Sequence, residues 1–251
     1  MSIKKFRNCF LLDESLNNNL VSGNKFRKLQ GILSKTGEIS GIISFGSPYS
    51  SHLLACAWWA KKMDIPFFGI VISDKEIAPK DYPHLKMAKI FGASLSFTSS
   101  QKAYSDIENA KHNFSEYFWI PGGAHTIDAA ITYERYFNEL FKKEDFMNDI
   151  ESIILPYGTG TTAYGIWKSV QNNNRAICIY GISVSRSKEK CYQAIQELEG
   201  KDKFDGLVIS DQFAGQYGTL NKNTNQYRWD FFKETGILPD PIYNAKSVHF
   251  Y

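Results

Sequence analysis

Short runs of apolar and β-branched residues alternate along this chain with longer stretches in which apolar positions recur at helical spacing. The short runs predict strands at residues 40–45, 66–72, 94–97, 152–155 and 176–182, and the longer stretches predict helices at 52–63, 84–91 and from about 162. Strands that alternate with helices are typical of βα units in a parallel sheet. We therefore expect an α/β fold.

The predicted βα units fall into two sets, which indicates two domains. A breaker cluster at residues 120–123 (Ile-Pro-Gly-Gly) lies between the two sets. Proline and glycine in succession end regular structure, so we expect the chain to cross from one domain to the other here.

Composition narrows the class of protein. The 251 residues are 43% hydrophobic and carry a formal net charge of +3, which is ordinary for a globular protein and too balanced to indicate nucleic-acid binding. The four cysteines lie far apart, which predicts neither a zinc site nor a disulfide framework, and we expect reduced thiols in the cytoplasm. No apolar run approaches membrane-spanning length, and we expect neither a membrane nor a metal partner.

Lys25 is the first candidate for chemistry. It follows a turn-forming Ser-Gly-Asn and stands where a helix is expected to begin. A buried lysine beside other cations has a lowered pKa and can form an imine with an aldehyde cofactor, and Arg27 and Lys28 supply those cations. On residue types alone, a solvated basic helix start is the commoner alternative.

The second candidate is the stretch 158–165 (Gly-Thr-Gly-Thr-Thr-Ala-Tyr-Gly), which lies between a predicted strand and a predicted helix. Successive backbone N–H groups and hydroxyls at a helix start suit a phosphate. The third glycine comes one position too late for a dinucleotide fingerprint, and no Gly-Lys-Ser/Thr of a Walker loop is present. A tight turn without a ligand remains the alternative.

The third candidate is the stretch 44–52, in which small hydroxyl residues again open a predicted helix. Ser50, Ser51 and His52 stand at the helix start, where backbone donors suit a carboxylate. An ordinary N-cap by Ser50 or Ser51 is an equally good interpretation of these residues.

Together these segments resemble the pyridoxal 5′-phosphate (PLP) enzymes of the tryptophan-synthase β-like fold (fold type II), and among them the 1-aminocyclopropane-1-carboxylate deaminase and D-cysteine desulfhydrase family. Two later segments agree in order, Gln216-Tyr217-Gly218 and Asp240-Pro241-Ile242-Tyr243. The resemblance covers nearly the whole chain. It implies two domains of parallel sheets with flanking helices, a small one at 27–120 and a larger, cofactor-binding one made of 1–26 with 121–251, shortened at both ends relative to the family.

The resemblance also implies roles for individual residues. Lys25 carries PLP as a Schiff base and then shuttles a proton. The other implied cofactor contacts are Asn24, Lys28, Ser51, Gly158, Thr159, Gly160, Thr161 and Thr162. Ser50, Tyr217 and Tyr243 are the implied catalytic partners of Lys25, and Ser50, Ser51, His52 and Asn244 are the implied substrate contacts.

We therefore expect a PLP-dependent lyase or deaminase that acts on a small amino acid. By the resemblance, the position of Asn244 holds Glu in the deaminases and Thr in the desulfhydrases. The neutral side chain of Asn244 favours a desulfhydrase-like substrate. Ser51 in place of the family's asparagine, together with the early end of the chain, supports an alternative, a catalytically silent member that only binds PLP or another phosphate ligand. A plain nucleotide-binding module is a third possibility, and exposed sheet edges favour a homodimer.

Overall fold

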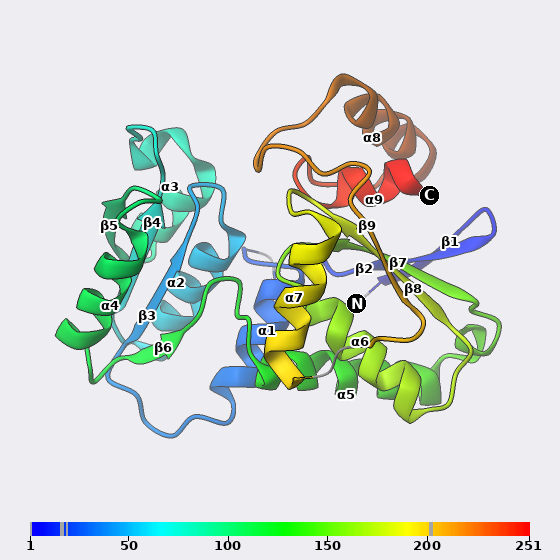
Figure 1. Cartoon of the computed structure of the whole chain (residues 1–251), viewed down its shortest axis with the longest axis horizontal. Coiled ribbons are helices and arrows are strands. Elements are labelled where there is room, and N and C mark those ends of the chain that lie inside the picture. The colour runs from blue at the N-terminus through cyan, green and yellow to red at the C-terminus, as the bar shows by residue number, and fades with distance from the viewer. Residues whose placement is uncertain (1, 16–17, 19, 201–202) are drawn as a thin grey trace. The chain divides into compact units, whose positions relative to one another are not determined.

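A computed structural model of the protein describes residues 2–15, 18, 20–200 and 203–251. The chain forms two compact units, one ending at His125 and one running from Thr126 to Tyr251 (Figure 1). The boundary falls just after the predicted breaker cluster. The described residues before Lys25 lie in the first unit, where Glu14 forms an ion pair with Arg27, whereas the sequence assigned 1–26 to the larger domain. The predicted domain division itself stays a prediction.

The first unit contains a four-stranded parallel sheet in the order β5-β4-β3-β6. Its strands are β3 (Ile42–Gly46), β4 (Phe67–Ile72), β5 (Ser94–Thr98) and β6 (Phe118–Ile120), and its helices are α1 (Asn24–Leu33), α2 (Ser51–Met63), α3 (Pro83–Ile90) and α4 (Ala103–Asn113), with a short 3₁₀ turn η2 (Pro79–Asp81). An antiparallel hairpin of β1 (Ser2–Phe6) and β2 (Cys9–Asp13) precedes them. The strands and helices predicted in this region are present, with ends shifted by one or two residues.

The β3 strand occupies the middle of this sheet and sets the position of the candidate carboxylate loop. It pairs with β4 on one side and β6 on the other, so that Ser44 lies opposite both Gly69 and Ile120. Its first three residues are buried and its last two are half-buried, which is typical of an inner parallel strand. The loop that leads to α2 therefore starts from an inner strand of the sheet.

The second unit contains a three-stranded parallel sheet in the order β7-β8-β9. Its strands are β7 (Ser152–Tyr157), β8 (Cys178–Ser183) and β9 (Leu207–Ser210), and its helices are α5 (Ile127–Lys143), α6 (Thr161–Asn172), α7 (Lys188–Glu199), α8 (Lys222–Thr235) and α9 (Asn244–Phe250), with a 3₁₀ turn η3 (Asp145–Asn148). The α/β prediction is confirmed, because the four-stranded and the three-stranded sheet are both parallel and their strands are linked through helices.

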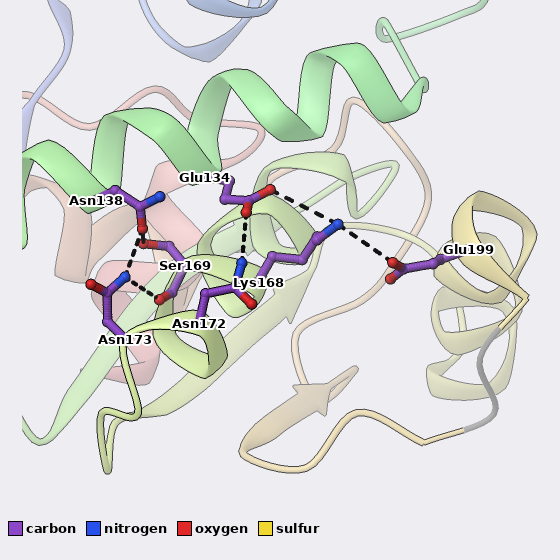
Figure 2. Close-up of polar contacts among 7 residues, drawn as sticks. All are labelled: Glu134, Asn138, Lys168, Ser169, Asn172, Asn173 and Glu199. Atoms are coloured by element: carbon purple, nitrogen blue, oxygen red, sulfur yellow. Dashed lines mark hydrogen bonds and ion pairs between the residues drawn. The ribbon is translucent and has the colours of Figure 1, made fainter.

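The α6 helix, which begins at the glycine-rich loop, is held by a polar network (Figure 2). Ser169 Oγ and Asn173 Nδ2 both donate to Asn138 Oδ1 on α5, at 2.6 and 2.7 Å. On the adjacent turn, Lys168 Nζ lies 3.4 Å from Glu199 Oε1 on α7 and 3.9 Å from Glu134 Oε2 on α5. The Ser169 side chain is fully buried, so these contacts give α6 a defined position against α5.

Two further features concern the described part of the chain. None of its helices is both long and apolar enough to cross a membrane. Within the same residues, no three side chains of the metal-binding types come together as a group.

Candidate functional site

Lys25 lies in the first turn of α1, as predicted. Gly23 precedes the helix with φ +78°, a conformation that residues with a Cβ rarely adopt, and it lets the chain turn sharply into α1. The Lys25 side chain is half-buried, and its Nζ donates a hydrogen bond of 3.3 Å to Asn24 Oδ1. The predicted cofactor lysine is thus held at a helix start beside the predicted asparagine.

Lys28 lies one turn further along α1, with its side chain buried and only 1% exposed. Its Nζ donates to the Gly123 carbonyl at 3.3 Å, within the turn that follows β6. Burial lowers the pKa of Lys28 well below its ordinary value, and the charge of Lys25 lowers it further, while Glu14 opposes both. Arg27, which the sequence placed beside Lys25 as a second cation, instead forms an ion pair with Glu14 at 2.7 Å.

The start of α2 is compatible with both interpretations of the 44–52 stretch, an ordinary N-cap and a carboxylate site. Ser50 is the N-cap, and its Oγ accepts from the Leu53 N–H at 3.3 Å, while Ser51 begins the helix. The Ser47 hydroxyl is buried without a protein partner. A capped helix start with a buried hydroxyl beside it is able to receive a carboxylate through its backbone donors.

The His52 side chain is buried and is not open to a ligand. Its ring is 1% exposed, and its Nε2 lies 2.8 Å from Ser44 Oγ, which itself donates to the Ile120 carbonyl at 2.6 Å. Because Ser44 uses its proton for the bond to Ile120, His52 donates from Nε2 to Ser44. Burial, followed by the charges of Lys25 and Lys28, lowers the pKa of His52 to about 3. The ring is therefore neutral and ties α2 to β3, which limits its predicted substrate contact to the backbone N–H.

The glycine-rich loop joins β7 to α6, as predicted. Gly160 is the N-cap of α6 with φ +84°, and a Cβ there would lie 2.1 Å from the Tyr157 hydroxyl, so only glycine fits. The Thr159 and Thr161 hydroxyls are 3.2 Å apart, and the first turn of α6 carries no acidic residue. Backbone donors and hydroxyls without a neighbouring carboxylate are the chemistry that a phosphate requires.

The two predicted tyrosines meet although 26 positions separate them in sequence. Their hydroxyls, on Tyr217 and Tyr243, share a hydrogen bond, and the Tyr243 ring lies 3.5 Å from where a Cβ on Gly158 would stand. Burial raises the pKa of Tyr243, and Tyr217 and Asp240 raise it further. Asn244 is exposed, and its amide donates to Asp240 Oδ2 at 2.6 Å.

The predicted residues thus gather in two groups, one in each unit. The first unit brings together Asn24, Lys25, Lys28 and the start of α2; the second brings together the loop at 158–162 and the tyrosine pair. Ser44 and Asp240 lie in stretches that the sequence analysis singled out, but neither was predicted as a site residue. The Asp-Pro step at 240–241 was a usable signal, because aspartate before proline favours a turn in which its side chain accepts backbone donors.

Comparison with known proteins identifies the family. The family model described as "Pyridoxal-phosphate dependent enzyme" matches residues 3–237. The chain belongs to this family. The expected cofactor is confirmed, so the protein is a PLP-dependent enzyme, and the catalytically silent alternative is not favoured. The residues assigned to the site stay predictions.

Individual relatives agree with this assignment. A 1-aminocyclopropane-1-carboxylate deaminase of Bradyrhizobium sp. (strain BTAi1) is 24% identical over 91% of this chain and 75% of its own length. A crystal structure of an "ACC deaminase homologue" matches 96% of this chain and 77% of that one with a TM-score of 0.79 at 23% identity. A crystal structure of a T.th. threonine deaminase matches 90% of this chain and 76% of its own with a TM-score of 0.65 at 13% identity. These structures confirm the expected fold type.

Proposed function

We propose that the protein is a PLP-dependent deaminase or lyase of small amino acids, with Lys25 as the lysine that binds the cofactor covalently. One observation carries the assignment: Lys25 stands at a helix start, held by Asn24, beside Lys28, a buried amine with a lowered pKa. Burial and the charge of Lys25 favour the neutral form of Lys28, so Lys25 faces a second amine rather than a second fixed positive charge. The names of the relatives support the deaminase class over the silent alternative.

The residues present fit PLP. Phosphate suits the start of α6, where Gly158, Thr159, Gly160, Thr161 and Thr162 would hold it; Asn24, Lys28 and Ser51 are the other proposed contacts. When bound, PLP withdraws electrons from bonds at the substrate α-carbon. The chain's own contribution is to hold the Lys25 amine in place for proton transfer.

Substrate recognition is proposed for the start of α2 and for the tyrosine pair. Ser50, Ser51 and the His52 backbone N–H would bind the substrate carboxylate at the helix N-terminus. Tyr243, whose raised pKa keeps its hydroxyl protonated, would donate a hydrogen bond to the substrate, with Tyr217 as its partner.

The neutral Asn244 favours a D-cysteine-like substrate, whereas the names of the relatives favour 1-aminocyclopropane-1-carboxylate. We keep D-cysteine as the first substrate to test, because a neutral amide cannot replace a carboxylate in an electrostatic role. Sulfide release distinguishes the two, since only cysteine contains sulfur.

We further propose a cytoplasmic protein that forms a homodimer. All four cysteines are free thiols, which suits a reducing compartment. The outer edge of β5 and that of β9 have no partner strand within the described sheets, and open edges favour association. Gel filtration with light scattering measures the oligomeric state.

The test of the cofactor assignment is borohydride reduction after PLP is added to the purified protein, followed by peptide mass mapping. We expect a visible absorption band and a pyridoxyl adduct on Lys25 in the wild type, and neither in Lys25→Ala. Lys222→Ala is the matched control, because Lys222 also stands in the first turn of a helix but is exposed. An adduct elsewhere, or none, overturns the assignment, and adduct formation without turnover of any small amino acid supports the silent alternative.

A further inference from the structure

The segment from Pro239 to Lys246 carries Tyr243 and is anchored at both ends. Arg228 Nε on α8 donates to the Pro239 carbonyl at 2.5 Å. At the other end the buried Lys246 amine donates to the Val184 carbonyl, just past β8. A segment fixed at both ends still has to turn sharply between them to begin α9 (Figure 1).

Asp240 organises that turn. Its Oδ1 accepts from the N–H groups of Ile242 at 3.0 Å and Tyr243 at 2.7 Å. Its Oδ2 accepts from the Asn244 N–H at 2.9 Å, and its carbonyl accepts from the Ala245 N–H at 3.0 Å. These are the donors that the start of a helix leaves without an intrahelical partner. One residue thus satisfies four consecutive backbone N–H groups around Tyr243.

This arrangement determines where the Tyr243 hydroxyl points. The Tyr243 side chain is rigid beyond its two rotatable bonds, so its backbone position decides whether its hydroxyl reaches Tyr217 and whether its ring covers Gly158. We propose that Asp240 is a positioning residue that sets the Tyr243 hydroxyl against Tyr217, above the glycine-rich loop. The inference rests on the proposed function for its catalytic meaning, but the geometry stands without it.

The charge of Asp240 adds a second effect on the same hydroxyl. Together with burial and the neighbouring Tyr217, it raises the pKa of Tyr243. A carboxylate near a phenol disfavours the phenolate, so Asp240 adds to what burial and Tyr217 already do and favours the protonated hydroxyl, which can donate a hydrogen bond. The position of Tyr243 therefore depends on Asp240, whereas its protonation depends on burial and Tyr217 first.

The test compares Asp240→Asn, Asp240→Ala and the control Ser187→Ala. Asparagine keeps one acceptor oxygen for Ile242 and Tyr243 but loses the charge, which makes it the variant that preserves the fold best. Ser187 is a helix N-cap of the same unit, bonded to the Lys190 N–H at 3.4 Å, and it reports the loss of a cap alone. Hydrogen exchange of the backbone amides of residues 242–245 is followed by mass spectrometry in PLP-free protein, because these are the N–H groups that Asp240 accepts from.

We expect residues 242–245 to exchange faster than in the wild type in both Asp240 variants, most in Asp240→Ala, and at the wild-type rate in Ser187→Ala. On the substrate that the holoenzyme accepts, we expect kcat to fall roughly tenfold in Asp240→Asn and roughly a hundredfold in Asp240→Ala, with little change in KM. Wild-type exchange rates at residues 242–245 in both Asp240 variants overturn the inference, and so does a loss of stability alone that matches Ser187→Ala. The exchange measurement needs no PLP, so it decides the role of Asp240 even if no adduct forms on Lys25.

Discussion

Replacing Gly165 by alanine tests how closely α5 and α6 pack. A Cβ at Gly165 would lie 2.2 Å from the Ala130 carbonyl oxygen and 2.9 Å from the Tyr133 Cβ. Ordinary contacts of this kind begin near 3.4 Å. The two helices must therefore separate locally by about 1 Å to accept one methyl group, because the nearest obstacle is backbone and cannot rotate away.

The expected cost is the balance of three effects. Alanine in a helix interior is more favourable than glycine by about 1 kcal/mol. Overpacking a close-packed contact costs about 1–3 kcal/mol. The separation also weakens the buried bond from Ser169 to Asn138, which is worth about 1 kcal/mol. We expect Gly165→Ala to lower the free energy of unfolding by about 2 kcal/mol, opposite in sign to helix propensity alone.

Urea unfolding of PLP-free protein measures this change. Tryptophan fluorescence is a suitable signal because Trp167 lies on α6, and circular dichroism is followed in parallel because two units that unfold separately give transitions that do not coincide. Gly37→Ala is the control, since a Cβ there meets nothing within 4 Å. A Gly165→Ala protein as stable as the wild type, or more stable, would refute the close approach of α5 and α6.

Two further predictions concern the site itself. In Gly160→Ala the new Cβ meets the Tyr157 hydroxyl, which donates to the Cys191 carbonyl at 2.7 Å and cannot easily move. We therefore expect PLP affinity, measured by spectroscopic titration, to fall at least about tenfold. Unchanged affinity would count against the predicted phosphate loop. The pKa of His52 is about 3 in the folded protein and 6.5 in the unfolded chain, so protonation in acid favours the unfolded state. Between pH 7 and pH 5, the free energy of unfolding should therefore fall by about 2 kcal/mol more in the wild type than in His52→Asn. Equal pH slopes in urea unfolding of the two proteins would show that His52 is not buried as a neutral ring.

Features that depend on neighbours in sequence could be predicted from the sequence. The helix start at Lys25 follows from the Ser-Gly-Asn turn, and the loop at 158–162 follows from glycines between an apolar run and an amphipathic stretch. The parallel α/β fold follows from the alternation of those elements. The hairpin of β1 and β2 was not predicted, because a two-stranded hairpin of this length is not stable by itself and depends on contacts outside its own sequence.

Only the tertiary structure decided which of these residues are buried and what they contact. Lys28 and His52 have the pattern of exposed polar residues in sequence, yet packing buries both and lowers their pKa values. The pairing of Tyr217 with Tyr243, and the hold of Asp240 on the latter, come from the way α8 and α9 fold back within the second unit. Turn chemistry and periodicity act over a few residues, whereas burial and electrostatic environment are set by residues far along the chain, so sequence alone determined the elements and tertiary structure determined their chemistry.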